Sequence, residues 1–259
     1  MSGKVVVHIG TAKTGSSSLQ RFLAINRKAL NECGWDYPDL NHTFNSEIPY
    51  TSRWMNGGKT YLLNGDKKRF DSYLKEIDLI YEKYNVIISD EAIFGYGQSF
   101  VKSLQQRYRD ISLVVYLRRQ DTRIEAENAQ LIKASIVDQN WVKEGYDVMP
   151  LNSYVDKLLK ERCTRFFYSE RLNEFVKIVG KSNLSVNTYE EAKNAGLYRH
   201  FISVLGLDYE GFESPQNCNL SLSVLDTEAK RRLNVFLREQ SIPIYRAIND
   251  EYRRVIIRE

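Results

Sequence analysis

Several features that define common protein classes are scarce in this sequence. Its three cysteines, Cys33, Cys163 and Cys218, lie far apart and form neither a Cys-x-x-Cys pair nor a spacing with histidine that suits a metal. We therefore expect reduced thiols, no disulfide framework and no metal site. No apolar run approaches the roughly 18 residues that identify a membrane-spanning helix, so we expect no integral membrane segment.

Charge of one sign is also missing. The chain has 37 basic and 33 acidic side chains, a net charge of +4. So small a net charge produces no strong field for a polyanion, and we expect no nucleic-acid partner. The first apolar run begins without a hydrophobic leader, which favours a cytoplasmic protein. With 259 residues, 42% of them hydrophobic, the chain can bury a substantial core, and we expect a single domain over residues 1–259.

The most informative stretch is residues 4–23, KVVVHIGTAKTGSSSLQRFL. Its β-branched run over 5–9 predicts a short buried strand, and the apolar spacing from residue 19 predicts a helix. The loop between them contains two glycines, one lysine and several hydroxyl residues. Backbone N–H groups of such a loop and the positive end of the following helix attract an anion, and the lysine adds a mobile charge. Three serines at the helix start suggest hydroxyl groups that contact this ligand, because serine is only a middling helix former.

The loop differs from that of nucleoside-triphosphate-binding proteins, in which the lysine directly follows the second glycine. Here Ser16 follows Gly15, and Lys13 lies two residues before that glycine. The segment from His8 to Gln20 instead resembles the 5′-phosphosulfate loop of sulfotransferases that use 3′-phosphoadenosine 5′-phosphosulfate (PAPS), and most resembles their bacterial carbohydrate-type branch. The resemblance implies that Lys13 acts in catalysis. The residues that it implies for nucleotide binding in this loop are Thr11, Ala12, Lys13, Thr14, Gly15, Ser16 and Ser17.

A later strand and helix carry a second phosphate motif. The apolar run Ile111–Leu117 predicts a strand, Arg118 follows it, and residues 122–135 predict a helix. This unit resembles the 3′-phosphate-binding strand and helix of the same family, which implies that Arg118 binds the 3′-phosphate. A guanidinium offers a rigid fork of donors for that purpose. The sequence departs from the family at Ala126, where a serine is usual, so one hydroxyl contact is missing or comes from elsewhere.

A polar segment near the end of the chain extends the resemblance. Residues 217–223 are similar to the family's late Asn-x-Ser-Leu-Ser segment, which implies that Asn219 and Ser221 lie near the nucleotide. From the residues alone, the segment is a polar loop ahead of a helix predicted over 227–237.

Alternating strands and helices define the expected fold. Apolar runs predict two further strands, over 85–88 and 184–189. Helical spacing predicts helices over 67–84, 98–109, 153–161, 166–179 and 197–205. The alternation predicts an α/β fold with a mainly parallel central sheet flanked by helices, a P-loop-like three-layer domain. Such sheets bind ligands at the carboxyl ends of their strands, where Gly10, Ser89 and Arg118 fall.

Transfer to a hydroxyl needs a base, and two candidates stay open. Glu91 follows the strand 85–88 at the expected ligand edge, and we prefer it because a strand end holds a carboxylate more rigidly than a long loop holds an imidazole. His42 lies in a long polar segment, residues 39–59, and its ordinary pKa near ~6.5 suits a general base at neutral pH. Alternative roles for Glu91 are to cap the next helix or to pair with an arginine.

The resemblance implies transfer of a sulfuryl group from PAPS to an acceptor hydroxyl, with adenosine 3′,5′-bisphosphate as the product. The bacterial branch favours an acceptor on a carbohydrate or a glycolipid. Two alternatives stay open. A P-loop kinase or NTPase would hold magnesium with Asp90, but it requires a lysine after Gly15. A non-catalytic nucleotide-binding protein would be compatible with Ala126.

Overall fold

The computed structural model describes residues 3–39, 67–133, 144–161, 163, 166–215 and 223–240. The chain divides into two compact units. The first comprises residues 1–118 and 167–216, and the second comprises residues 119–166 and 217–259. The single domain expected over 1–259 stays a prediction.

A five-stranded parallel sheet forms the centre of the first unit, with the order β2-β3-β1-β4-β5. The strands are β1 (Val5–His8), β2 (Trp35–Asp36), β3 (Asn85–Ser89), β4 (Ile111–Leu117) and β5 (Leu184–Thr188). The β-branched runs of β1, β3 and β4 were predicted as strands because such runs suit a sheet buried on both faces. β2 was not predicted, since two residues carry no periodic signal.

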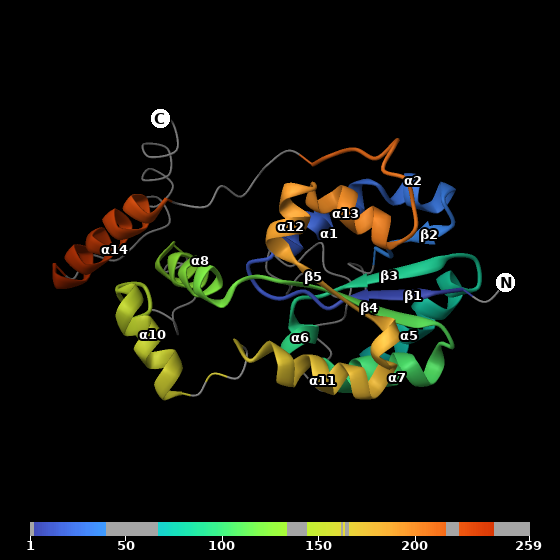
Figure 1. Ribbon diagram of the computed structural model, residues 1–259, viewed down its shortest axis with the longest axis horizontal. Coiled ribbons are helices and arrows are strands. Elements are labelled where there is room, and N and C mark those ends of the chain that lie inside the picture. Colours follow the sequence, from blue (N-terminus) through green and yellow to red (C-terminus); the bar gives the residue numbers. More distant parts are fainter. Residues whose placement is uncertain are drawn as a thin grey trace. The chain divides into compact units, whose positions relative to one another are not determined.

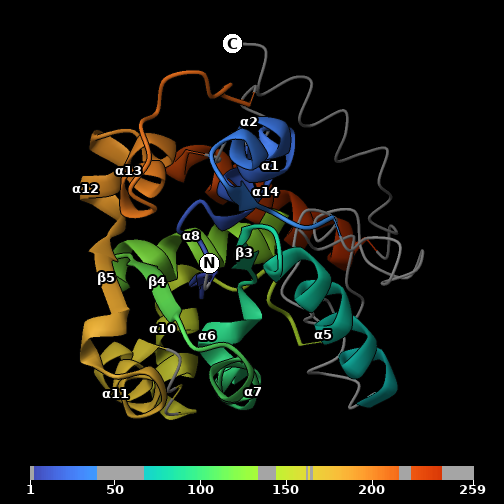
Figure 2. The same ribbon diagram turned by 90° about the vertical axis from the view of Figure 1, so that its right-hand side faces the viewer.

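Helices cover both faces of this sheet (Figures 1 and 2). One face carries α1 (Ser16–Ile25), α2 (Arg27–Glu32), α12 (Tyr189–Asn194) and α13 (Leu197–Val204). The other face carries α5 (Lys67–Tyr81), α6 (Ala92–Tyr96), α7 (Gln98–Arg107) and α11 (Tyr168–Val179), which a short 3-10 helix, η3 (Lys181–Asn183), joins to β5. Alternate side chains of β1 enter the two cores, Val6 the first and Val5 and Val7 the second. The predicted α/β fold with a parallel sheet between two helical layers is confirmed.

The helices differ from prediction mainly at their ends. The sequence predicts one helix from residue 19 that continues over residues 26–31, but α1 ends at Ile25 and α2 begins at Arg27. Asn26 lies at this break, and its side-chain amide bonds the Phe22 carbonyl and both backbone groups of Glu213. A side chain engaged in this way competes with the regular helical hydrogen bonds. α6 and α12 were not predicted, because helices of five and six residues show too little periodicity.

The second unit contains the helices α8 (Gln120–Lys133), α10 (Leu151–Lys160) and α14 (Val224–Glu239). Its buried interior contains both apolar and polar side chains. The Asn234 side chain donates to the carbonyl oxygens of Ile132 and Asp147 and accepts a hydrogen bond of 2.7 Å from Lys230 Nζ. None of the described helices is long and apolar enough to cross a membrane.

We expect Lys230 to give this unit a pH-dependent stability. Burial lowers its pKa from 10.5 to about 8. Between these values the unfolded chain holds a proton that the folded chain has lost, so stability rises with pH across this window. The free energy of unfolding of the wild type relative to Lys230→Met should therefore rise by about 2 kcal/mol from pH 7.5 to pH 9.5.

Urea unfolding of both proteins at the two pH values measures this difference. Lys160→Met, which removes an exposed lysine from the same unit, controls for the loss of one positive charge. If the free energy of unfolding changes equally with pH in the wild type and in Lys230→Met, the lowered pKa assigned to Lys230 is contradicted.

Candidate phosphate-binding site

The loop between β1 and α1 adopts a strained conformation. Lys13 has φ of +68° and Gly15 has φ of +74°, both in the left-handed region. Lys13 is the one non-glycine residue with positive φ in the described part of the chain. A side chain in that region costs about 1 kcal/mol and is typical of ligand-binding and active sites. Glycine at the N-cap of α1 offers no capping side chain, so the first N–H groups of the helix remain suited to an anion.

Hydroxyl side chains hold this loop from within. Thr14 Oγ1 donates to the Thr11 carbonyl oxygen over 2.7 Å, and Ser16 Oγ donates to the same oxygen over 3.3 Å. Thr11 Oγ1 donates to the Tyr116 carbonyl oxygen on β4 over 3.0 Å. All three hydroxyl residues are buried. Their side chains therefore shape the loop, and their predicted contact with a nucleotide stays a prediction.

The next two serines also bond to protein groups. Ser17 Oγ donates to Glu91 Oε1 over 3.4 Å, and Ser18 Oγ shares a hydrogen bond with the Tyr198 hydroxyl. The first bond joins the start of α1 to the end of β3. It places the Glu91 carboxylate beside the loop, at the strand edge where it was expected.

Asp90, and not Glu91, caps the helix that follows β3. The backbone N–H of Ala92 donates to Asp90 Oδ1 over 2.7 Å, whereas Glu91 makes no side-chain capping bond to α6. Asp90 is fully buried, and Glu91 is partly exposed. The alternative role of Glu91 as a helix cap is therefore wrong, and its carboxylate faces the serine of the loop.

Arg118 reaches the same loop from the end of β4. Its Nη1 donates to the Lys13 carbonyl oxygen over 3.1 Å, and its guanidinium carbon lies 5.6 Å from the centre of the Tyr189 ring. Its own carbonyl accepts a hydrogen bond from the Tyr168 hydroxyl. The sequence suggested separate phosphate sites for Lys13 and Arg118, but the structure brings their residues into direct contact. The neighbouring Arg119 is exposed and pairs with Asp121 over 2.6 Å.

Residues after β5 complete the wall of the loop and were missed in the sequence. A methyl group at Gly15 would lie 2.7 Å from Leu197 Cδ2 and 3.4 Å from Tyr189 Cε2. Partial burial raises the pKa of the Tyr189 phenol above its usual value, which keeps the phenol neutral. A usable signal existed, because Tyr189 is the last residue of the strand predicted over 184–189 and so lies at the ligand edge.

Several predicted site residues lie outside the described part. His42, Asn219 and Ser221 fall in residues 40–66 and 216–222, so their predicted roles stay predictions. Ala126 lies on α8 in the second unit. Within the described residues, no three His, Cys, Asp or Glu side chains are grouped so that they could hold a metal.

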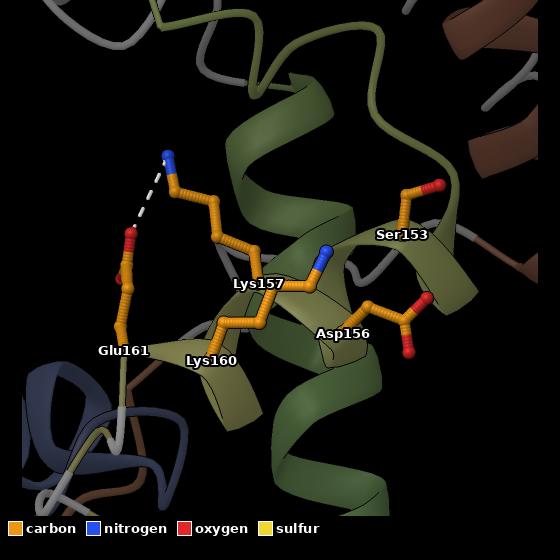
Figure 3. Close-up of a pocket in the computed structure, with 5 residues that line it drawn as sticks. All are labelled: Ser153, Asp156, Lys157, Lys160 and Glu161. Atoms are coloured by element: carbon orange, nitrogen blue, oxygen red, sulfur yellow. Dashed lines mark ion pairs between the residues drawn. The ribbon is translucent and has the colours of Figure 1, made fainter.

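A surface pocket lies on α10 of the second unit (Figure 3). Its lining residues are Ser153, Asp156, Lys157, Lys160 and Glu161. Lys157 Nζ lies 3.3 Å from Glu144 Oε2, 3.8 Å from Glu161 Oε1 and 4.0 Å from the centre of the Tyr146 ring. Because this ammonium is already paired on several sides, we assign no ligand to the pocket.

Comparison with known proteins gives structural similarity alone. No protein-family model matches the chain, and no curated protein matches it. A sulfotransferase from Alicyclobacillus acidocaldarius is 18% identical, with a TM-score of 0.49 over 93% of this chain and 96% of that one. The sulfotransferase domain of the curacin biosynthetic pathway is 10% identical, with a TM-score of 0.49 over 89% of this chain and 83% of that one. The sulfotransferase domain of the Synechococcus PCC 7002 olefin synthase is 10% identical, with a TM-score of 0.42 over 90% of this chain and 95% of that one.

Gly15 provides a test of the loop, and Gly34 is its matched control. Both have positive φ, +74° and +78°, but the space around Gly34 is open, whereas a methyl group at Gly15 meets Leu197. Alanine at either position should lower the free energy of unfolding by about 1 kcal/mol, the cost of a left-handed side chain. Only Gly15→Ala should also weaken binding of adenosine 3′,5′-bisphosphate, by tenfold or more. Calorimetric titration measures the affinity for the bisphosphate. Equal losses of affinity in both variants would contradict the assignment of this loop as the binding site.

Proposed function

We propose that this protein is a sulfotransferase that uses PAPS as its donor. The observation that supports this proposal is the hydrogen bond from Arg118 Nη1 to the Lys13 carbonyl. It brings Arg118, at the end of β4, onto the glycine-containing loop that carries Lys13. A ligand with two separated phosphates, such as PAPS, suits this arrangement because each phosphate can pair with one cation. The resemblance of both motifs to those of PAPS-dependent sulfotransferases supports the same conclusion. We further propose that the enzyme acts in the cytoplasm.

The loop residues fit the demands of sulfuryl transfer. In this reaction the acceptor oxygen bonds to sulfur while the bond between sulfur and the bridging phosphate oxygen breaks, and that oxygen leaves with adenosine 3′,5′-bisphosphate. Negative charge therefore develops on the 5′-phosphate, as it does in phosphoryl transfer. Lys13 and the N–H groups at the start of α1 would stabilise this charge by preorganised electrostatics. The nucleotide-binding roles proposed for Thr11, Ala12, Thr14, Gly15, Ser16 and Ser17 rest on their backbone groups.

Glu91 is our proposed base. Its Oε1 lies 3.4 Å from Ser17 Oγ, so the carboxylate lies beside the loop that would hold the donor. A carboxylate there can take the proton that the acceptor hydroxyl loses. His42 stays the second candidate for this role. Asn219 and Ser221 are proposed to contact the nucleotide on the strength of the resemblance.

The proposed acceptor is a hydroxyl group of a carbohydrate or glycolipid. Its support is the resemblance to the bacterial carbohydrate-type branch. Incubating the protein with 35S-labelled PAPS and a panel of sugars, glycolipids, phenols and amines tests this proposal. If the label is transferred to a phenol or an amine and to no sugar, the proposed acceptor class is wrong. The proposal that PAPS is the donor would still stand.

The kinase alternative is disfavoured by the geometry of Asp90. A magnesium-binding acid must present its oxygens to the ion, but this carboxylate is fully buried and accepts the N–H of Ala92. The lysine that such enzymes place after the second glycine is Ser16 here, and its hydroxyl points back to the Thr11 carbonyl. The non-catalytic alternative shares the nucleotide site and differs only in turnover.

Ligand-induced stabilisation should separate the donor classes. Adenosine 3′,5′-bisphosphate at a hundredfold excess over its dissociation constant should stabilise the protein by about 2.7 kcal/mol. For a chain of this size, that corresponds to a rise in melting temperature of roughly 5–10 °C. ATP with magnesium at the same concentration should give a much smaller rise. An equal or larger rise with ATP in differential scanning fluorimetry would refute the sulfotransferase proposal.

Two adjacent arginines test the 3′-phosphate assignment. Arg118→Ala should weaken binding of adenosine 3′,5′-bisphosphate by tenfold or more, because a charged hydrogen bond to one phosphate contributes about 1.5–3 kcal/mol. Binding of 5′-AMP should weaken clearly less, because that nucleotide loses only the support that Arg118 gives to the loop. Arg119→Ala removes the same charge from an exposed residue paired with Asp121 and should change neither affinity by more than about twofold. Calorimetric titration of both nucleotides measures this. If Arg119→Ala gives the loss, or if Arg118→Ala weakens both nucleotides equally, the 3′-phosphate is bound elsewhere.

A further inference from the structure

A buried polar cluster lies beneath the phosphate loop, and the function above does not use it. His8 ends β1 and is fully buried. Its Nδ1 lies 2.8 Å from Ser89 Oγ on β3, and Gln20 Nε2 of α1 donates to the same oxygen over 3.2 Å. The cluster thus joins one strand, its neighbour and the helix that follows the loop. All three elements belong to the first unit (Figure 1).

The imidazole in this cluster is neutral. Burial lowers the pKa of His8 to about 4. The direction of the hydrogen bond between His8 Nδ1 and Ser89 Oγ depends on which ring nitrogen carries the proton. Nε2 is buried and has no hydrogen-bond partner among the described residues.

The ring forms the floor of the loop. A methyl group added at Gly10 would lie 3.0 Å from His8 Cε1 and 2.6 Å from Ser16 Oγ, so the loop backbone lies close against the edge of the imidazole. The ring centres of Tyr116 and Phe201 lie 5.9 and 6.0 Å away and limit the ring's movement on the other sides. A shift of the imidazole would therefore displace the start of the loop.

The backbone of His8 adds a second link. Its carbonyl oxygen accepts a hydrogen bond of 3.2 Å from the N–H of Asp90, the residue before Glu91. His8 and Ser89 are also direct partners in the parallel pairing of β1 with β3. Both the side chain and the main chain of His8 thus connect the loop to the end of β3.

We propose that His8 is a positioning residue for the phosphate loop. Its neutral ring is bonded to Ser89, which also accepts a hydrogen bond from Gln20, and lies close to Gly10. In this way the ring fixes the loop N–H groups in the arrangement that binds the 5′-phosphate. This inference rests on the proposed function, because it assigns the 5′-phosphate of the nucleotide to the loop. His8 itself does not touch the ligand.

The test compares two nucleotides that differ only in the 5′-phosphate. The ratio of dissociation constants for adenosine 3′-monophosphate and adenosine 3′,5′-bisphosphate reports what the loop contributes, whereas general damage to the core weakens both alike. His8→Leu replaces the ring with an apolar side chain of similar volume that cannot bond to Ser89. It should lower this ratio at least tenfold. His8→Asn keeps a polar atom where Nδ1 lies but lacks the far edge of the ring, so it should lower the ratio less than His8→Leu does.

Ser89→Ala removes the same bond while keeping the ring, so it should match His8→Leu. The double variant should lose no more than either single change, because both act through one interaction. Ser89→Ala also carries the test if His8→Leu does not fold. The control is Tyr108→Phe, which removes a hydrogen bond to Asp78 from another buried aromatic residue of the same unit and should leave the ratio unchanged.

The outcomes separate the two proposals. A wild-type ratio near one, or no binding of the bisphosphate, would refute the proposed function and the role of His8 with it. A large wild-type ratio that persists in both His8→Leu and Ser89→Ala would overturn the role of His8 alone. A ratio that falls at least tenfold in these two variants and falls less in His8→Asn is the expected result.

Discussion

The parallel pairing of β1 with both β3 and β4 is the constraint on which the site depends. Parallel strands run in the same direction, so the residues after each strand lie at the same edge of the sheet. Lys13, Glu91 and Arg118 come from three such ends, more than 100 positions apart along the chain at the extremes. A one-residue slip of β1 would turn His8 to the other face and separate the loop from its floor.

Within this frame, the loop is held by its own side chains and by Arg118. The hydroxyl groups of Thr11, Thr14 and Ser16 donate to carbonyl oxygens. The groups of the loop that remain suited to an anion are therefore backbone N–H groups and cationic side chains. The guanidinium of Arg118 donates a hydrogen bond to the carbonyl oxygen of Lys13, the residue with the strained backbone. Charge at the strand edge and the conformation of the loop are therefore linked through one side chain.

Much of this arrangement could be predicted from the sequence, because local signals determine it. The runs of β1, β3 and β4 consist of β-branched residues that suit a buried sheet, and the order of motifs located Gly10, Ser89 and Arg118 at the ligand edge. Other features could not be predicted, because they depend on contacts distant in the chain. The inward turn of the Ser16 hydroxyl, the approach of Leu197 to Gly15 and the capping role of Asp90 each need the folded partner. The two residues of β2 gave no pattern at all.

The left-handed conformation of Lys13 also bears on how this protein could be stabilised by mutation. Glycine would adopt φ of +68° without steric cost, so Lys13→Gly would relieve about 1 kcal/mol of backbone strain. It would also delete the cation that we place at the 5′-phosphate. A search for thermostable variants would therefore favour a substitution that removes the proposed chemistry, which is the trade-off expected where activity and stability make opposite demands on one residue. Screens for stability in this chain should hold position 13 fixed.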